Sequence, residues 1–584
     1  MIRKEIDKLL VDGAKAAGYG EVNLTSTFSS LPQVCDFQCN GCFALSKELK
    51  QNPLEIAENI VKNIKNQQNF EFFVAKPAFI NIKMTDKFLS QIGQAYLKDE
   101  RGGLPKHEKS EFVVLDYGGA NVAKALHVGH LRPAIIGESL KRLYKLMGDK
   151  VISDVHLGDW GLQMGLTELE LYEEGKLDGY FGNGENKALT IDDLNVAYPK
   201  ASARKNTDAE FAEKAQAWTL KIQRRESPYF EIYQVIRELS VKEIEANYSK
   251  LGAKFDLWYG ESTADEYCDE AIAIIDSKGL SKMSEGAKVV EVAEEGENVP
   301  TTDKNGEIKY INPMPPCLIQ KSNGAALYAT TDIATILMRN KMYGGLDRIE
   351  YVTDARQKLH FKQVFRVCKK AGISPEGQQL VHIVNGTMNG RDGKPFKTRS
   401  GDTIKLEDII SMLEEKAAEK LKSNGVETDK NLALQIGVAA MKFGDLINNV
   451  SKDYIFDLDK FLSFEGKTGP YLQYTMVRIN SILNKVNMPC GDIKVQTDDE
   501  RDIIKAIIKL NSSYEICYQE KSLSGLCSAA YDLASAFSTF YNNHNVINEK
   551  DAARQASFVS LLTLVKNKLA QALDVLAIEI PEKM

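Results

Sequence analysis

The sequence predicts three parts: a small α+β domain, an interrupted α/β domain with a parallel sheet, and an all-α bundle. Three observations predict this arrangement. A buried-strand run at residues 112–116 is followed by a glycine-containing loop and an amphipathic helix, which is how a β–α–β unit opens. The same alternation returns near residue 349, after a long polar stretch. From about residue 405 the strand signals fade and helical patterns dominate.

Residues 1–103 are predicted to form the α+β domain. Helical periodicity covers residues 6–17 and 52–66. Two strand-like runs, residues 70–75 and 79–84, are joined through Lys76-Pro77 and predict a hairpin. The breaker cluster at residues 101–105 predicts a linker to the next domain.

Residues 104–404 are predicted to form the α/β domain. Strand 112–116 leads into the loop at residues 117–121, and a helix from about residue 131 to 147 stops at Gly148. Further along come a strand at 349–352, a helix at 360–371 and a strand at 380–384. Residues 168–310 between the two halves are richer in polar and acidic residues and predict an insertion with helical patterning. Such sheets bind ligands at the carboxyl ends of their strands, which makes the loop at 117–121 a candidate site.

Residues 405–465 are predicted to be a helical connector and residues 466–584 the all-α bundle. The bundle holds 13 Lys and Arg and 13 Asp and Glu, so it is neutral, whereas the whole chain carries a net charge of −7. That total argues against indiscriminate binding to nucleic acid, but an RNA partner that meets a local basic surface stays possible.

Composition narrows the class of protein. With 584 residues, 43% hydrophobic and 27% charged, the chain can bury a sizeable core. It has no run of about 18 apolar residues, so we expect no membrane span. Its charged start lacks the apolar core of an export signal, and nine cysteines, an odd number, favour reduced thiols. We therefore expect a cytoplasmic protein.

The sharpest motif is His127-Val128-Gly129-His130. Only seven histidines occur in the chain, and this pair lies where a helix follows a buried strand. Free backbone N–H groups and the positive end of the helix favour a phosphate there, and two imidazoles add donors for charge that develops on it. Gly129 would let an adenine ring lie against the backbone. The alternative is a structural or metal-binding pair, but helical zinc pairs are usually spaced four apart with a nearby glutamate.

A series of motifs in one order carries a family resemblance. The blocks are Asn121-Val122-Ala123-Lys124 ahead of the two histidines, Ile135-Ile136-Gly137, Leu157-Gly158-Asp159-Trp160-Gly161, Leu327-Tyr328 to Ala334, Tyr351 to Gln357, Gly390 to Gly401, and Gly469-Pro470-Tyr471-Leu472-Gln473-Tyr474. Over nearly the whole chain they resemble the class I aminoacyl-tRNA synthetases, in their arginyl form. The resemblance implies a Rossmann-like nucleotide-binding catalytic domain, a first domain that meets the tRNA elbow, and an anticodon-binding bundle.

The resemblance also implies an arginine pocket. Asp332 would take the guanidinium group, supported by Tyr328 and Gln357, and Asp116 and Asn121 would hold the α-amino end. A guanidinium has five donors, no acceptor and a permanent charge, so a carboxylate and neutral acceptors suit it. If Tyr328 opens a helix, Tyr328 and Asp332 share one of its faces. The alternative is that Asp332 is only a helix-end carboxylate and Tyr328 only a core residue.

The second catalytic loop departs from the class pattern. Where most class I enzymes have Lys-Met-Ser-Lys-Ser, this chain has Phe396-Lys397-Thr398-Arg399-Ser400. Lys397 and Arg399 could reach the outer phosphates of ATP, and Lys124 is the rival for that role. A solvated basic loop is the third possibility.

Two further sets of residues are candidates for a metal site and for contacts with RNA. Cys35, Cys39 and Cys42 match the spacing of an iron–sulfur or zinc site, but the chain lacks the repeated βα pattern of a barrel, and we expect no stable protein-bound metal. In the bundle, aromatic and amide side chains suited to unpaired anticodon bases are Tyr471, Gln473, Tyr474, Arg478, Tyr541, Asn542 and Asn543.

Together these observations predict an ATP-dependent ligase that joins L-arginine to its tRNA through arginyl-adenylate, releasing AMP and pyrophosphate. We expect magnesium to accompany the nucleotide, and we expect a monomer. Two rival hypotheses stay open at this point. One is a class I synthetase for another amino acid, and the other is an RNA-binding relative without catalytic activity.

Overall fold

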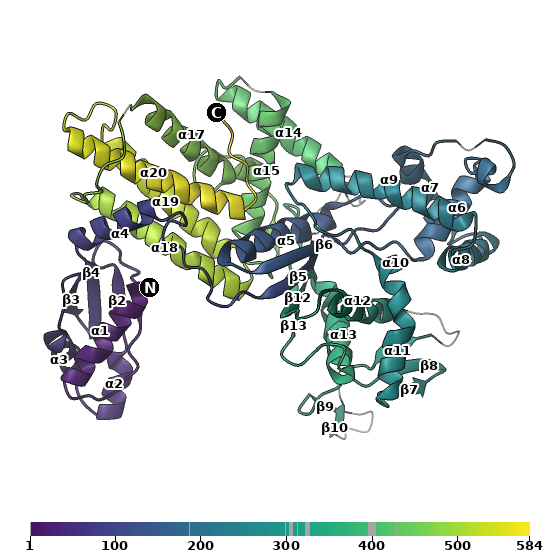
Figure 1. Ribbon diagram of the computed structural model, residues 1–584, viewed down its shortest axis with the longest axis horizontal. Coiled ribbons are helices and arrows are strands. Elements are labelled where there is room, and N and C mark those ends of the chain that lie inside the picture. The colour runs from purple at the N-terminus through teal and green to yellow at the C-terminus, as the bar shows by residue number, and fades with distance from the viewer. Residues whose placement is uncertain are drawn as a thin grey trace. The chain divides into compact units, whose positions relative to one another are not determined.

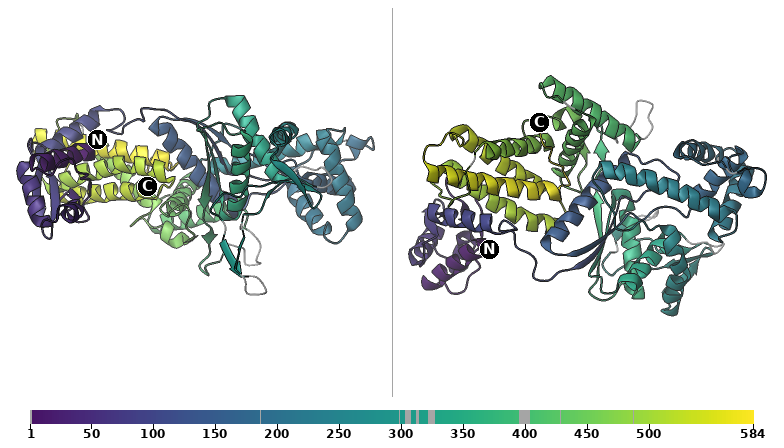
Figure 2. Two further views of the ribbon diagram at one scale, coloured as in Figure 1. Left: turned by 90° about the horizontal axis from the view of Figure 1, so that it is seen from below. Right: turned by 45° about the horizontal axis from the view of Figure 1, so that its top comes forward.

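The computed structural model describes residues 2–185, 187–297, 299–302, 308–311, 314–321, 327–394, 404–427, 429–486 and 488–584. The chain divides into two compact units. The first comprises residues 1–105, 475–513 and 529–571, and the second residues 106–474, 514–528 and 572–584. Figures 1 and 2 show the elements of both units.

A parallel sheet forms the centre of the second unit. Its strand order is β13-β12-β5-β6, and every neighbouring pair is parallel. The strands are β5 (Phe112–Tyr117), β6 (Lys150–Asp154), β12 (Arg348–Asp354) and β13 (Gln379–Asn385). The three strands predicted for this domain are confirmed, while β6 was not predicted. The order changes direction between β5 and β12, and the carboxyl ends of strands at such a switch point form the ligand crevice of α/β sheets.

Helices cover both faces of this sheet (Figure 1). The helix α5 (Val128–Met147) lies on one face, where Tyr144 of α5 donates to Glu350 of β12 at 2.8 Å. The helices α12 (Tyr328–Tyr343) and α13 (Lys358–Ala371) lie on the other. Ile349 and Tyr351, the neighbours of Glu350 along β12, share a buried core with them. Successive side chains of a strand point to opposite faces of the sheet. The buried strand β12 can therefore hold the Glu350 carboxylate on one face and apolar residues on the other.

The helix α5 lies very close to β5. A Cβ atom added at Gly137 would stand 2.1 Å from the ring of Tyr117, so only glycine fits at this crossing. The helix also begins at Val128, three residues earlier than predicted, which places Pro133 in its second turn rather than its first. The missing N–H of Pro133 therefore leaves the carbonyl of Gly129 without its usual helical donor.

The predicted insertion is helical first and then stranded. Its helices are α6 (Leu162–Glu173), η1 (Asp178–Phe181), α7 (Ile191–Arg204), α8 (Ala209–Gln223), α9 (Tyr229–Lys250), α10 (Glu261–Ala264), η2 (Asp265–Tyr267) and α11 (Cys268–Ser277). The strands are β7 (Ser281–Ser284), β8 (Ala287–Val290), β9 (Val299–Thr302), β10 (Ile308–Ile311) and β11 (Cys317–Gln320). These strands were not predicted, because four residues are too few for a recognisable alternation.

The remaining elements are mostly helices, as the fading strand signal after residue 405 predicted. They are β14 (Met388–Asn389), α14 (Leu406–Ser423), α15 (Lys430–Leu446), β15 (Tyr454–Ile455), α16 (Leu458–Phe461), α17 (Gly469–Lys485), α18 (Asp498–Glu520), α19 (Ser524–Asn543) and α20 (Ala552–Val575). Among the described residues, no helix is both long and apolar enough to cross a membrane.

The first unit contains the predicted α+β domain. Its antiparallel sheet has the order β1-β2-β4-β3. The strands β3 (Phe70–Ala75) and β4 (Phe79–Met84) form the predicted hairpin, while β1 (Ser26–Phe28) and β2 (Phe37–Cys39) were not predicted. The helices are α1 (Ile2–Ala16), α2 (Cys42–Leu49), α3 (Pro53–Asn63) and α4 (Asp86–Lys98). The predicted helices at 6–17 and 52–66 correspond to α1 and α3.

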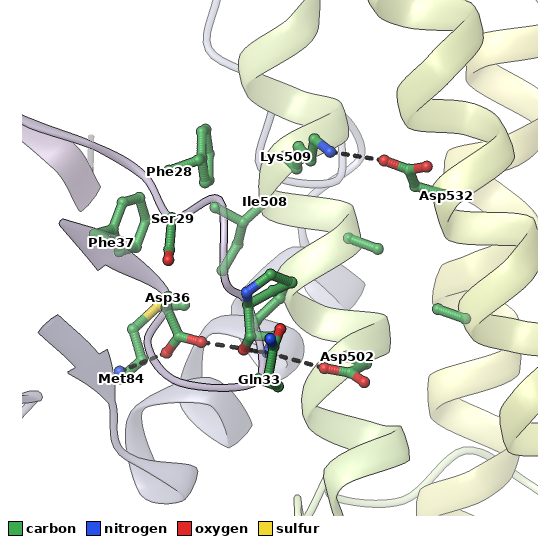
Figure 3. Close-up of a pocket in the computed structure, with 14 residues that line it drawn as sticks. Phe28, Ser29, Gln33, Asp36, Phe37, Met84, Asp502, Ile508, Lys509 and Asp532 are labelled. Atoms are coloured by element: carbon green, nitrogen blue, oxygen red, sulfur yellow. Dashed lines mark hydrogen bonds and ion pairs between the residues drawn. The ribbon is translucent and has the colours of Figure 1, made fainter. Parts of the chain in front are cut away.

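A pocket of about 400 Å³ lies in this unit, lined from the sheet side and by α18 and α19 (Figure 3). Phe28, Phe37 and Met84 form part of its apolar lining. Asp36 accepts the backbone N–H of Met84 at 2.7 Å and pairs with Lys505 at 3.3 Å. The residues predicted to act in catalysis lie elsewhere, so this pocket is not their site.

We predict that Gly137→Ala destabilises the protein. Helix propensity alone favours alanine by about 1 kcal/mol, but overpacking against Tyr117 costs about 1–3 kcal/mol, so packing decides the sign. The melting temperature should therefore fall. The control is Gly119→Ala, whose added Cβ would meet its nearest atom at 3.6 Å, an ordinary contact. A melting temperature that rises in Gly137→Ala would contradict the close packing.

Candidate functional site

The two histidines of the sequence motif cap the start of α5. The backbone N–H of Gly129 donates to Nδ1 of His127 at 3.0 Å, and the backbone N–H of His127 donates to Nδ1 of His130 at 3.1 Å. Their ring centroids are 4.0 Å apart. The two imidazole rings therefore accept backbone N–H groups as serine and glutamate side chains do in an ordinary capping box. These hydrogen bonds to the helix start fix the positions of the rings.

This cap determines which ring nitrogen carries the proton. An Nδ1 atom that accepts a hydrogen bond has no proton, so in the neutral ring the proton is on Nε2. Burial lowers the pKa of His127 and lowers that of His130 to about 3, with Lys124 adding to both shifts. Both rings are therefore neutral near pH 7, and each offers one Nε2–H donor.

The expectation of free backbone N–H groups at this helix end is wrong for the first three positions, since the N–H of His130 donates to the carbonyl of His127 at 2.9 Å. The N–H of Val128 donates to the carbonyl of Ile404 at 3.0 Å, and that of Gly129 to the ring of His127. Gly129 is needed for this arrangement, because a Cβ there would stand 2.8 Å from the His127 ring. The donors left for a phosphate are the imidazoles.

Of the basic residues predicted to act at this helix end, the structure describes Lys124. Lys124 is exposed and has no bonded carboxylate among the described residues. Leu406 donates to the carbonyl of Leu126 at 2.9 Å, so the segment at 404–406 runs beside the motif. Lys397 and Arg399 lie outside the described residues, shortly before this anchored segment.

A buried ion network lies at the carboxyl ends of β5 and β6. Nη2 of Arg339, from α12, donates to Oδ2 of Asp116 at 2.6 Å and to Oδ2 of Asp154 at 2.7 Å. Arg339 is 1% exposed, and its guanidinium lies 5.4 Å from the ring centroid of Tyr351. Burial raises the pKa of Asp116, and Arg339 opposes that shift. One carboxylate oxygen of Asp116, a predicted substrate ligand, is thus already bonded within the protein.

Asn121 lies in the loop after β5, as predicted. The loop pairs with the segment after β6, since the N–H of Val122 donates to the carbonyl of Gly158 at 3.0 Å. The Asn121 side chain is close to Gly158, where a Cβ would stand 2.4 Å from its Oδ1 atom. Asn121 itself is exposed.

Two of the three predicted guanidinium ligands, Tyr328 and Asp332, lie on the first turns of α12. That helix begins at Tyr328, so Tyr328 and Asp332 do share a face. Glu261, the first residue of α10, comes close enough to raise the pKa of Tyr328 further after burial has raised it. Burial raises the pKa of Glu261 itself to about 7, with Asp332 adding to the rise. Two carboxyl groups from separate elements therefore influence each other electrostatically, and one of them also influences Tyr328.

Other nearby carboxylates already have cationic partners. Arg339 pairs with Asp116 and Asp154, and Arg237 pairs with Asp159 at 2.8 Å. Among the described residues, neither Glu261 nor Asp332 has a lysine or arginine partner. Asp332 has instead a histidine, since Nε2 of His360 lies 2.5 Å from its Oδ2. Gln357, the last of the predicted arginine ligands, is exposed at the end of η3 (Ala355–Gln357), three residues before His360.

The structure does not gather the three cysteines into a ligand set. Within the described ranges, one group of three metal-ligand side chains meets, and it consists of Asp116, Asp154 and His156. Arg339 bridges the two aspartates of that group, so a resident cation does not fit it. Burial raises the pKa of Cys39, and that of Cys42 to about 12, which disfavours the thiolates that a cluster needs.

The residues predicted to read the anticodon are distributed over both units. Gln473 is fully buried, and its amide donates to the carbonyl of Glu579 at 2.7 Å. This placement argues against an RNA contact by Gln473. Tyr471 and Tyr474 lie on the same helix and are partly exposed. In the first unit, the Arg478 guanidinium lies 4.9 Å from the ring centroid of Tyr541, and Asn542 is exposed beside it.

Sequence reasoning missed four residues of this site: Glu261, His156, His360 and Arg339. His156 is the second residue after β6 and has a φ of +40°. Its buried Nδ1 atom has no hydrogen-bond partner among the described residues. A polar residue at the end of a parallel strand would have been a signal, had β6 been predicted. Glu261 and Arg339 carry no local signal, because their partners are far away in the sequence.

Comparisons with known proteins agree over the whole chain. Residues 91–458 match the family model for the catalytic domain of class I (R) tRNA synthetases, residues 472–584 that for the DALR anticodon binding domain, and residues 1–84 that for the arginyl tRNA synthetase N-terminal domain. Arginine–tRNA ligase of Agathobacter rectalis is 41% identical, with 100% of this chain and 99% of that protein covered. The ligase of Alkaliphilus oremlandii is 40% identical, with both chains covered completely.

Solved structures show the same fold. Arginyl-tRNA synthetase of Plasmodium falciparum superposes with a TM-score of 0.80 at 23% identity, covering 100% of this chain and 99% of that chain. Thermus thermophilus arginyl-tRNA synthetase superposes with a TM-score of 0.79 at 21% identity, with full coverage of both.

We predict that His130 makes the fold sensitive to acid. Its pKa is about 3 in the folded protein against an ordinary 6.5, so between these values the unfolded chain binds a proton that the folded chain does not. Stability therefore falls as pH falls below 6.5. In His130→Asn the amide oxygen can still accept the N–H of His127, but nothing titrates. The melting temperature of the variant should drop less between pH 7 and pH 5, and parallel curves would contradict the assignment.

Proposed function

The chain belongs to the arginyl-tRNA synthetase family, and we propose that the pocket at Asp332 and Glu261 receives L-arginine while His127 and His130 contact ATP. The protein is an arginine–tRNA ligase. It uses ATP to attach L-arginine to its tRNA through arginyl-adenylate, with release of AMP and pyrophosphate.

The observation that carries the arginine site is a pair of carboxyl groups without a lysine or arginine partner. The charges of Asp332 and Glu261 act on each other, and that of Glu261 acts on Tyr328, while no lysine or arginine among the described residues pairs with either carboxyl group. A buried or half-buried carboxylate pair is costly unless a cation joins it. A guanidinium, with its five N–H donors, matches two carboxylates and a phenol better than an ammonium does.

The other predicted ligands fit the remaining groups of arginine. Gln357, at the end of η3 and three residues before His360, would offer a neutral acceptor to the guanidinium. Asp116 binds Arg339 through Oδ2, which leaves its Oδ1 atom for the α-amino group. Asn121, in the loop that follows β5, supplies an amide at the same end. These assignments place the substrate along the carboxyl ends of β5 and β6, with its carboxylate toward α5.

For ATP, the proposal rests on the fixed Nε2–H donors of His127 and His130. They would hydrogen-bond the α-phosphate and stabilise the charge that develops when the arginine carboxylate attacks it. Val128 and Gly129 leave room for the adenine ring, because Gly129 has no side chain. Magnesium would arrive with the nucleotide phosphates, since Arg339 already occupies the acidic cluster of the protein.

We assign Lys124 to the pyrophosphate side, with Lys397 and Arg399 as the alternative. Lys124 is near enough to both histidines to lower their pKa values, so a phosphate held by those rings is within its field. No residue needs to act as a nucleophile in either step. Catalysis is then positioning and charge stabilisation. By family resemblance, bound tRNA is expected to assist even the first step.

The tRNA surface is proposed from side chains that remain accessible. Arg478, Tyr541 and Asn542 combine a cation, a ring and an amide in one unit, and Tyr471 and Tyr474 contribute rings in the other. A cytoplasmic location stays a prediction, supported by nine free cysteines of which eight are buried. The monomeric state also stays a prediction, which light scattering would test.

We predict that Asp332→Asn raises the KM for arginine by at least a hundredfold, because a charged partner of the guanidinium is lost. Glu261→Gln should raise it about tenfold. ATP–pyrophosphate exchange with tRNA present measures both, and Asp276→Asn, a carboxylate on α11 that pairs with Lys288, is the control. Unchanged arginine kinetics in Asp332→Asn, or exchange with another amino acid only, would overturn the arginine pocket.

We predict that Lys124→Met lowers kcat by at least tenfold with little change in the KM for arginine, because its charge acts on the departing pyrophosphate. The double variant Lys397→Met/Arg399→Met should lose less. Lys145→Met, at the far end of α5, is the control for losing a lysine. A larger loss in the double variant would move the role to that loop.

A further inference from the structure

A histidine outside the predicted site holds the carboxylate that is proposed to bind the guanidinium. His360 lies in the first turn of α13, and its Nε2 atom is 2.5 Å from Oδ2 of Asp332 on α12. Both side chains are largely shielded, at 29% and 21% exposure. The contact joins two helices that follow different strands, so it reflects how the site is assembled and not local chain geometry.

The contact uses only one oxygen of Asp332. For a hydrogen bond to a carboxylate, Nε2 of His360 must carry a proton, whichever charge the ring has. The other oxygen, Oδ1, has no partner among the described residues. Asp332 is therefore free to turn about its Cβ–Cγ bond unless His360 holds it, because terminal torsions of this kind have broad minima. With His360 in place, the plane of the Asp332 carboxylate is fixed, and its Oδ1 atom stays available to a ligand.

The ring of His360 is itself held. It lies edge-on to the ring of Phe361, with centroids 5.3 Å apart and planes at 76°. Phe361 is buried in the core that α12 and α13 share. The N–H donor of His360 is therefore held in place by packed side chains, as is required of a residue that positions another one.

We propose that His360 is a positioning residue for arginine specificity: it fixes the plane of the Asp332 carboxylate so that Oδ1 meets a planar guanidinium. This inference rests on the proposed arginine site. A guanidinium donates along defined directions in its own plane, so the orientation of its acceptor matters. An ammonium group is a compact charge with rotatable donors and is much less sensitive to that orientation.

The test compares two substitutions at one position. His360→Leu removes the donor, and His360→Gln keeps an N–H donor near the place of Nε2. In the presence of tRNA, His360→Leu should raise the KM for arginine roughly five- to twentyfold, the usual weight of a hydrogen bond to a charged acceptor in a partly exposed site. The KM for ATP and kcat at saturating arginine should stay within about twofold. His360→Gln should restore most of the loss.

Two competitive inhibitors distinguish a changed orientation of the Asp332 carboxylate from a general loss of structure. In His360→Leu, competitive inhibition by n-butylguanidine should weaken as much as arginine binding does, whereas inhibition by n-butylamine should stay nearly unchanged. Gln363→Leu is the matched control, because it removes a side-chain hydrogen bond one turn further along α13, to the carbonyls of Pro315 and Pro316. Its arginine kinetics should match the parent. If His360→Leu melts at a much lower temperature, His360→Asn takes its place, since its donor stops short of Oδ2.

Three results would overturn the inference. They are an unchanged KM for arginine in His360→Leu, equal weakening of both inhibitors, and no recovery in His360→Gln. The variant Asp332→Asn distinguishes a failure of the inference about His360 from a failure of the arginine site itself. If Asp332→Asn abolishes arginine use while His360→Leu has no effect, only the role of His360 fails. If Asp332→Asn leaves arginine kinetics unchanged, the proposed site fails and the role of His360 fails with it.

Discussion

The buried ion network of Arg339 with Asp116 and Asp154 is the constraint on which the rest of the site depends. It ties α12 to the carboxyl ends of two neighbouring strands, and α12 carries Tyr328 and Asp332 on its first turns. Removing one member of such a network leaves a buried charge uncompensated, at a cost of about 3–5 kcal/mol. The position of Tyr328 and Asp332 thus follows from a structural ion pair, which would not itself need to touch the guanidinium in the proposed site.

The same network explains the electrostatics of the pocket. Several carboxylates gather within a few elements, yet most of them are matched inside the protein by Arg339 and Arg237. Asp332 and Glu261 have no lysine or arginine partner among the described residues, and they are the carboxyl groups proposed to receive the ligand. The proposed ATP site at the start of α5 has the opposite character, because two neutral histidines and Lys124 would offer donors and positive potential to a phosphate. In the proposed arrangement an acidic arginine site therefore borders a basic ATP site.

Sequence patterns predicted what depends on neighbours in the chain. The strands of the parallel sheet other than β6, the hairpin of β3 and β4, and the helical tail all have local signals of periodicity. What could not be predicted depends on distant contacts. Glu261 approaches Asp332 from another element, and Arg339 is a buried cation inside an apolar helix. The start of α5 was missed because histidine is not an ordinary capping residue.

The histidine cap of α5 has a consequence for how such a protein diverges. The helix is held by the Nδ1 atoms, whereas the proposed phosphate contact uses the Nε2 atoms. Under the proposed mechanism, stability and catalysis would depend on opposite sides of the same rings. Exchange of both histidines for asparagine would keep the acceptors that begin the helix but remove the Nε2–H donors, because the shorter amide N–H groups do not reach as far. Two substitutions would therefore be enough to give a folded relative without adenylation chemistry. Loss of this motif in a related sequence then does not imply loss of the fold.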